Sequence, residues 1–410
     1  MNLILLTNQF PTQEGDYNFI KTEWQEIVKT FDKIILISRS KKRKCDLQLP
    51  PNVVLKWYMP KKISIMYSFS AIFDREVRNE IILAKNDCNI RTYFIRIIQI
   101  IKYVCIERDF AHYIDKLNLE KGFYVYTYWL NAPTISFLVK RNSLEIKKIV
   151  SRVHGADLYQ NRTKGDWQPF RNYISRNIDS LIFPCNKAFE YYKRHWSVLF
   201  KPIISYIGCS KKNRIEHKKR NKFILVSCSN MISLKRIDLI IKGLSKIKCN
   251  SIFIEWHHFG DGKLKKFLED LSNELLKEKN ISFKFWGNIP NELLGKYYEE
   301  IKPDLFITTT QTEGGAPISI QEAFSMGIPA IGTNVGGIPE LIINHYSGML
   351  LPESPSYDEV SRCIQEYIFL DEDIKEKYSS NAYNLWKEKF NSEKNAKEFI
   401  SIIFKEEKNK

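Results

Sequence analysis

The chain has 410 residues, 44% of them hydrophobic and 13% aromatic, so its composition excludes a disordered protein and its length exceeds one ordinary core. Its net charge of +16 lies mainly in residues 1–200, which hold 32 Lys and Arg against 19 Asp and Glu. This asymmetry suggests that the first half meets a nucleic acid or an anionic membrane.

The first half predicts strands that alternate with helices. It opens with an apolar strand at 2–7, which lacks the basic leader and cleavage site of a signal peptide. Further strands are expected at 33–38, 53–59, 124–130, 147–155 and 180–185, with a helix at 18–31. This alternation is typical of a doubly wound α/β domain.

The segment IRTYFIRIIQIIKYVCIER (90–108) predicts a helix with an apolar stripe, flanked by Arg91, Arg96, Lys102 and Arg108. A basic amphipathic helix can lie in a membrane interface, but the stripe equally fits a domain helix whose apolar face is core. No apolar run reaches the ~18–20 residues that span a bilayer. The clusters KKRK (41–44) and Lys61-Lys62 could either add to a surface for anionic lipids or form solvated loops.

The pattern breaks at 209–222, a charged stretch without apolar periodicity, and a second α/β series follows. Its strands are expected at 223–229, 251–260, 281–287, 304–310 and 329–332, and its helices at 235–247, 263–276 and 291–301. We therefore expect two Rossmann-like domains, 1–210 and 211–385, facing across a cleft. The segment 386–410 is predicted to be a helix and tail that pack back on the N-terminal domain.

Six of the 17 glycines fall within residues 314–337, between apolar runs. The pattern predicts strand, loop, helix, strand, loop and helix, which places two loops at the carboxyl edge of a parallel sheet, where ligands bind in open α/β folds. Glycine permits close approach of a ligand to the backbone, and helix N-termini attract phosphate. Two interpretations remain open: a site for a phosphorylated, hydroxyl-rich ligand, with Glu313 and Glu322 as acceptors for hydroxyls, or simply tight turns with a surface glutamate.

The eight cysteines include no C-x-x-C pair, so we expect neither a zinc site nor a disulfide framework, and a reducing compartment. His257 and His258 are adjacent but lack a third ligand nearby, so the sequence gives no sign of a metal.

Six segments taken together resemble glycosyltransferase family 4, the retaining transferases of the GT-B fold, and especially bacterial capsular, lipopolysaccharide and exopolysaccharide enzymes. The strongest likeness is in TEGGAPISIQEAFSMGIPAIGTNVGGIPELI (312–342). The others are NQFPTQEGDYNFIKTEW (8–24), SRVHGADLY (151–159), SCSNMISLKRIDLIIKGL (227–244), FGDGKLKKFLEDL (259–271) and FWGNIPNELLGKYYEE (285–300). The ordered combination covers nearly the whole chain.

The resemblance implies three catalytic positions. His154 would face the transferring sugar, Lys235 would neutralise the diphosphate, and Glu313 would lie against the donor sugar. It also implies donor-binding positions: Glu322 on the nucleotide ribose, Gly15 near the phosphates, the segment Gly314, Gly315, Ala316, Pro317 and Ile318 around sugar and phosphate, and Asn230 and Arg236 near the diphosphate.

The sequence departs from the family pattern in two places. Eight residues separate Glu313 from Glu322 where the family usually has seven, and we expect the extra residue in the loop, because a helix would turn by ~100° to absorb it. Asn230 stands where the family often has arginine, so Arg236 is expected to supply the second positive charge.

The resemblance implies transfer of a sugar from a nucleoside-diphosphate sugar to a hydroxyl, with the anomeric configuration kept and without a metal or other cofactor. The basic half fits a lipid-linked saccharide acceptor at the cytoplasmic face of the inner membrane. Two rival functions are a GT-B-like nucleotide-sugar epimerase, for which the sequence offers no additional catalytic acids, and a basic nucleic-acid-binding protein, for which it offers no motif. We therefore expect no nucleic-acid partner. The sugar, the base and the acceptor are not specified by these motifs.

Overall fold

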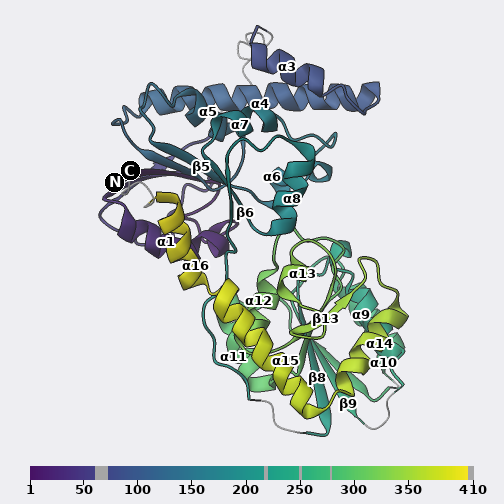
Figure 1. The fold of residues 1–410 in the computed structure, drawn as a ribbon. Helices are drawn as coiled ribbons and strands as arrows, with labels where there is room; N and C mark the ends of the chain where they lie inside the picture. The colour runs from purple at the N-terminus through teal and green to yellow at the C-terminus, as the bar shows by residue number, and fades with distance from the viewer. Residues whose placement is uncertain (61–72, 217–219, 249–251, 278, 405–410) are drawn as a thin grey trace. The chain divides into compact units, whose positions relative to one another are not determined.

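The computed structural model describes residues 1–60, 73–216, 220–248, 252–277 and 279–404 (Figure 1). The chain divides into two compact units, one formed by 1–207 with 396–410 and the other by 208–395. Lys61 and Lys62, which we considered as part of a lipid-facing surface, lie outside the described residues.

The first unit contains a seven-stranded sheet whose neighbouring strands all run parallel, in the order β3-β2-β1-β4-β5-β6-β7. The strands are β1 (Asn2–Thr7), β2 (Lys33–Ser38), β3 (Val53–Trp57), β4 (Tyr124–Thr127), β5 (Lys148–Arg152), β6 (Ser180–Phe183) and β7 (Lys201–Ile204). The sequence predicted the first six, and β7 was missed. The central strands are apolar because helices cover both faces of the sheet.

Two sets of helices bury the two faces of this sheet (Figure 1). One face carries α4 (Ile90–Lys116), α5 (Ala132–Val139) and α7 (Arg171–Asn177), and the other carries α1 (Tyr17–Thr30) and α16 (Ser392–Phe404). The remaining helices of the unit are α3 (Arg75–Leu83), α6 (Gly155–Leu158) and α8 (Asn186–His195). The ring of Phe404 in α16 lies 5.0 Å from that of Phe31 and 5.6 Å from that of Tyr124, so the C-terminal part of this helix packs on the N-terminal unit, as expected.

Helix α4 is both a core helix and a surface helix. Ile100, Val104 and Phe110 are buried against the sheet, whereas Phe94 and Ile98 of the predicted stripe are exposed. Arg96, one of the four basic residues that we expected to flank the stripe, is buried. Its guanidinium donates to the carbonyl oxygens of Gly165, Ala84 and Asn86 at 2.7–3.0 Å, because the C-terminal end of α3 and the loop at Gly165 supply acceptors that α4 itself cannot.

A buried ion pair links α1 to the centre of the first sheet. Arg152, at the end of β5, contacts Glu23 of α1, and Tyr126 bridges them by accepting from Arg152 Nε and donating to Glu23, both at 3.0 Å. Arg152 also donates to the Ser205 carbonyl at 3.0 Å. The side chains of Arg152 and Glu23 are only 0% and 3% exposed, so each charge depends on its partner.

The second unit contains a six-stranded parallel sheet in the order β10-β9-β8-β11-β12-β13. The strands are β8 (Lys222–Cys228), β9 (Phe253–Phe259), β10 (Ile281–Phe285), β11 (Leu305–Thr308), β12 (Ala330–Thr333) and β13 (Gly348–Leu351). The main helices are α9 (Ile237–Ser245), α10 (Lys265–Leu276), α11 (Asn291–Ile301), α12 (Ile318–Ser325), α14 (Tyr357–Ile368) and α15 (Glu372–Leu385), with a short α13 (Ile338–Leu341). Helices α9, α10 and α14 cover one face, and α11, α12 and α15 the other (Figure 1).

Residues 386–395, which we grouped with the C-terminal tail, belong to the second unit. Trp386 and Phe390 are buried there, and the indole N–H of Trp386 donates to the Cys209 carbonyl at 3.2 Å. Of the predicted segment 386–410, the described residues 396–404 belong to the first unit.

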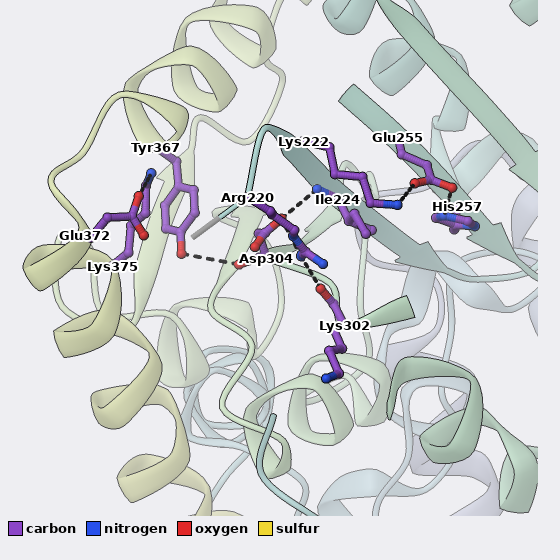
Figure 2. A network of polar contacts seen from close by, with 10 residues as sticks. All are labelled: Arg220, Lys222, Ile224, Glu255, His257, Lys302, Asp304, Tyr367, Glu372 and Lys375. Carbon is purple, nitrogen blue, oxygen red and sulfur yellow. Dashed lines mark hydrogen bonds and ion pairs between the residues drawn. The ribbon is translucent and has the colours of Figure 1, made fainter. Parts of the chain in front are cut away.

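Charged residues join neighbouring segments at the amino edge of the second sheet (Figure 2). The Asp304 carboxylate, just before β11, accepts from the Ile224 backbone N–H of β8 at 2.7 Å and lies 2.9 Å from Arg220. The Tyr367 hydroxyl of α14 donates to the Asp304 carbonyl at 3.3 Å. Arg220, from the charged stretch at 209–222, thus helps to hold two strands together, while the opposite, carboxyl edge holds the glycine-rich loops.

Candidate functional site

Three loops converge at the carboxyl edge of the second sheet, because they follow the adjacent strands β8, β11 and β12. We call them the lysine loop (229–236), the glycine loop (309–317) and the second glycine loop (334–337). Gln311 donates its backbone N–H to Leu234 at 2.8 Å, and Gly337 donates to Gly315 at 3.0 Å. Backbone hydrogen bonds therefore join the glycine loop to both neighbours.

Gly336 and Gly337 make this close approach possible. Gly336 has a φ of +52°, which side chains with a Cβ rarely adopt, and a Cβ on Gly337 would stand 2.6 Å from Ala316 N. The glycine loop then enters α12 at Ile318, so Gly314–Pro317 lie outside the helix. The prediction that the loop takes up the extra residue between Glu313 and Glu322 stays a prediction.

Glu322 lies in α12 and is 4% exposed. One carboxylate oxygen accepts from the side-chain amide of Asn291, the first residue of α11, at 2.7 Å. Asn291 did not stand out in the sequence, since it is 31 residues away from the glutamate that it orients. The contact with Asn291 fixes the orientation of the buried Glu322 carboxylate.

Lys235 and Glu313 form an ion pair between the lysine loop and the glycine loop. Their side chains are 23% and 17% exposed, so the pair is partly shielded from water. The two residues that the sequence singled out for the diphosphate and the sugar are therefore neighbours.

Arg236 is engaged by the protein backbone. Its guanidinium donates to the carbonyl oxygens of Thr309 at 2.7 Å, Thr310 at 3.0 Å and Glu353 at 2.9 Å. It cross-links three segments of the carboxyl edge, and a role in fixing the loops is better supported by this geometry than a second phosphate contact. Asn230, two residues beyond β8, has an exposed side chain.

The other candidate residues lie in the first unit, at the carboxyl ends of β1, β4 and β5. His154 follows β5 and its Nε2 lies 2.9 Å from the Tyr128 carbonyl oxygen, which can only accept, so Nε2 carries the proton. The ring packs 4.2 Å from that of Trp129. Burial lowers the pKa of His154 to about 3, so the imidazole is neutral at pH 7 and Nδ1 is an acceptor.

The loop after β1 is organised by Asp16, which the sequence did not single out. Its carboxylate accepts the backbone N–H groups of Asn8, Gln9 and Phe10 at 2.8–2.9 Å and the indole N–H of Trp129 at 3.2 Å. The neighbouring Gly15 has a φ of +56°, and a Cβ there would collide with the Gln9 side chain. Gly15 is therefore required by the loop, whatever contact it makes with a ligand.

His257 and His258 are accounted for by protein partners. The ring nitrogens of His258 lie 2.8 Å from Ser227 Oγ and 3.1 Å from the Ser229 carbonyl, and burial lowers its pKa to about 4. His257 Nδ1 accepts from Trp286 and its Nε2 lies 3.2 Å from Glu255 (Figure 2). Within the described ranges, no three His, Cys, Asp or Glu residues are grouped as metal ligands.

Comparison with known proteins agrees with this arrangement. Residues 210–385 match the family of glycosyl transferases group 1. The chain is 25% identical over 262 residues to the uncharacterized glycosyltransferase MJ1178 of Methanocaldococcus jannaschii, a match that covers 62% of this chain and 67% of that protein. It is 36% identical over 73 residues to the amylovoran biosynthesis glycosyltransferase AmsK of Erwinia amylovora, covering 17% and 18% of the two chains.

Solved structures share the whole fold at low sequence identity. Anabaena Alr3699/HepE, in complex with UDP and glucose, superposes with a TM-score of 0.65 at 12% identity over 98% of this chain and 99% of that one. The lipopolysaccharide outer core galactosyltransferase WaaB gives a TM-score of 0.62 at 17% identity over 99% of both chains. The two Rossmann-like domains thus share the GT-B fold of these glycosyltransferase structures, and residues 210–385 match the glycosyl transferases group 1 family.

Proposed function

We propose that this protein transfers a sugar from a nucleoside-diphosphate sugar to a hydroxyl of a lipid-linked saccharide, with retention of the anomeric configuration, in surface polysaccharide biosynthesis. The observation that carries the proposal is the convergence of Glu322, Lys235 and the glycine loop at one sheet edge. The relatives named for amylovoran and lipopolysaccharide outer core synthesis support the pathway class.

The donor would bind in the second unit. The buried Glu322 carboxylate, oriented by Asn291, is suited to accept hydrogen bonds from two vicinal ribose hydroxyls. The glycine loop allows the diphosphate to approach the backbone, and the start of α12 offers N–H groups without partners within the helix. Lys235 would exchange Glu313 for the diphosphate when the donor binds.

Different residues would stabilise the two opposite charges that develop in the transition state. As the bond between the anomeric carbon and the diphosphate breaks, negative charge collects on the diphosphate, and Lys235 with the N-terminus of α12 stabilises it. The sugar becomes cationic, and Glu313 lies in the loop that would face it. We favour departure and attack on one face of the sugar, with the diphosphate taking the acceptor proton. Neutral His154 can accept a hydrogen bond from a sugar hydroxyl through Nδ1.

The experiment that tests the donor site is thermal unfolding with UDP, GDP, ADP and CMP, then with sugar conjugates of the nucleotide that binds. A ligand at a hundredfold excess over its Kd stabilises the folded state by about 2.7 kcal/mol. Stabilisation by one nucleotide, abolished in Glu322→Ala, would support the proposal and identify the base. No stabilisation by any nucleotide would refute it.

The exposed face of α4 supports association with an anionic membrane. Ile90, Phe94 and Ile98 are 75%, 57% and 63% exposed, and Arg91 and Lys102 share this exposed sector of the helix. No helix within the described part of the chain is long and apolar enough to cross a membrane. The apolar side chains would enter the headgroup region while the cations meet anionic lipid.

Vesicle flotation tests this surface. The protein should float with vesicles containing phosphatidylglycerol and less so with pure phosphatidylcholine. The double variant Phe94→Ser, Ile98→Ser should lose binding, while Phe267→Ser, at an exposed position on α10 in the second unit, should not. Equal flotation of both variants would exclude α4 as the contact.

A further inference from the structure

A polar pocket lies at the carboxyl edge of the first sheet, and His154 is not among the residues that line it. It has a volume of about 640 Å³ and is lined by residues that follow three adjacent strands: Asn8 and Gln9 after β1, Arg39 to Lys42 after β2, and Met59 and Pro60 after β3. Glu14, from the loop after β1, completes the lining. The volume lies within the ~300–1,000 Å³ of typical small-molecule sites, and the position is the edge where ligands of parallel sheets bind.

The charges around this pocket leave an excess of positive charge. Lys42 is paired with Glu14 at 2.5 Å, so these two charges offset each other. Lys41 is exposed, and neither it nor Arg39 is within ion-pair distance of a carboxylate in the described part of the chain. Two of the three cations that line the pocket therefore lack a counter-charge.

Arg39 is the group best placed to hold an anion. It follows β2 directly, its backbone N–H donates to Thr7 at 3.1 Å, and NH1 donates to the Asn8 side-chain oxygen at 3.0 Å, which fixes the guanidinium. Its Nε is buried and has no hydrogen-bond partner among the described residues. Burial lowers the pKa of Arg39 from its ordinary value, which is the effect of a desolvated cation without a matching anion.

The same contacts connect the pocket to the predicted reaction site. The side-chain oxygen of Asn8, which accepts the hydrogen bond from Arg39, also lies 3.5 Å from the side-chain nitrogen of Asn131. The backbone N–H of Asn8 donates to the Asp16 carboxylate. Asp16 in turn holds Trp129, which packs on His154. The pocket and His154 are therefore joined by one hydrogen-bonded loop system within the first unit.

We propose that this pocket binds the phosphate or diphosphate group of the acceptor, with Arg39 as the bidentate anchor and Lys41 as a second cation. Arginine presents a planar fork that matches phosphate oxygens, and the bond from NH1 to Asn8, the one side-chain hydrogen bond of Arg39 among the described residues, leaves other N–H groups of the two terminal nitrogens for an anion. The proposal rests on the glycosyltransferase function, since it names the chemical class of the acceptor. That phosphate could belong to a lipid carrier or to a soluble sugar phosphate.

The test is calorimetric titration of the full-length protein whose donor site is saturated with the nucleoside diphosphate found in the thermal experiment. The probes are inorganic pyrophosphate, farnesyl diphosphate as a short lipid carrier, and glucose 1-phosphate. The variants are Arg39→Gln, Lys41→Gln and, as a matched control, Arg75→Gln, an exposed arginine of α3 in the same unit.

At least one probe should bind one-to-one to the wild type. In Arg39→Gln the affinity for that probe should fall about 10- to 100-fold, because hydrogen bonds to a charged group are lost. In Arg75→Gln the affinity should change less than twofold. Preference for farnesyl diphosphate would identify a lipid-linked acceptor, and preference for glucose 1-phosphate a soluble one. Lys41 is exposed and removable without disturbing the fold, so Lys41→Gln should weaken binding a few-fold even if Arg39→Gln unfolds.

Equal affinity in Arg39→Gln and the wild type, or no binding of any probe, would overturn the proposal. Nucleotide binding by the same samples reports the donor site independently. If nucleotides bind and the probes do not, only the acceptor proposal fails. If no nucleotide binds, the glycosyltransferase function fails, and the probes are then titrated alone to test the pocket.

Discussion

The ion pair between Lys235 and Glu313 leads to a prediction in which two substitutions act in opposite directions. If Lys235 leaves Glu313 for the diphosphate, then the glutamate competes with the ligand for the same ammonium. Lys235→Ala should weaken binding of the nucleoside diphosphate, and Glu313→Gln should strengthen it. Both side chains are less than one quarter exposed, so the competition is not screened away by solvent.

The magnitudes follow from the contacts. A hydrogen bond to a charged group contributes about 1.5–3 kcal/mol, so losing Lys235 should weaken nucleotide binding at least ~10-fold, the more so because Glu313 is left facing the diphosphate. A partly exposed ion pair is worth about 1 kcal/mol, so Glu313→Gln should strengthen binding about fivefold. Turnover should fall in Glu313→Gln, because a neutral amide stabilises a cationic sugar less than a carboxylate.

The assay is calorimetric titration of wild type and both variants with the nucleoside diphosphate and with nucleoside monophosphate, followed by turnover with the nucleotide sugar. The monophosphate is the internal control, because it should be affected much less by Lys235→Ala. Unchanged diphosphate affinity in Lys235→Ala would refute the phosphate role. Weaker binding in Glu313→Gln would show that the glutamate positions the lysine instead of competing for it.

Three further outcomes are expected. Glu322→Gln should keep the contact with Asn291 but weaken nucleotide binding about tenfold in the same titration, because a charge-assisted hydrogen bond becomes a neutral one. Glu23→Gln should destabilise the first unit by about 3–5 kcal/mol in denaturant unfolding, since it leaves Arg152 buried and uncompensated, whereas Glu26→Gln, in a helix-surface pair, should cost less than about 1 kcal/mol. Glu107, whose pKa burial raises from 4.5 to about 7, favours the folded state when protonated, so its contribution of up to about 3 kcal/mol is present below pH ~4.5 and is lost as the pH rises through about 7. Glu107→Gln should flatten that part of the measured stability–pH curve, and an unchanged slope would assign it to another group.

The strands that the sequence revealed are those with long apolar runs. β8 and β2 are covered on both faces and read as continuous hydrophobic segments. β7 and β13 were missed because each is an edge strand of four residues, too short to show a period. The doubly wound fold was predictable because the central strands define it.

Convergence of the candidate donor residues was also predictable, because loops after neighbouring parallel strands must meet at one edge. The partners that orient those residues were not. Asn291 is 31 residues from Glu322, and Asp16 is 113 residues from Trp129, and no local pattern links such pairs. These contacts exist only once the sheets have formed.

The arginines show why the sequence alone does not reveal whether a charged side chain binds the protein backbone or a ligand. Arg96 and Arg236 each donate to three backbone carbonyls, so their hydrogen-bonding capacity is largely spent on joining segments of the chain. Arg39 lies at a sheet edge like Arg236, but it donates to one side-chain amide and keeps a buried N–H without a partner in the described residues. Because fewer N–H groups of Arg39 are already hydrogen-bonded within the described residues, an anion would gain hydrogen bonds at Arg39 that it would not gain at Arg236. The hydrogen bonds therefore favour Arg39 over Arg236 as an arginine that can bind an anion, although the family resemblance had led us to expect that role of Arg236.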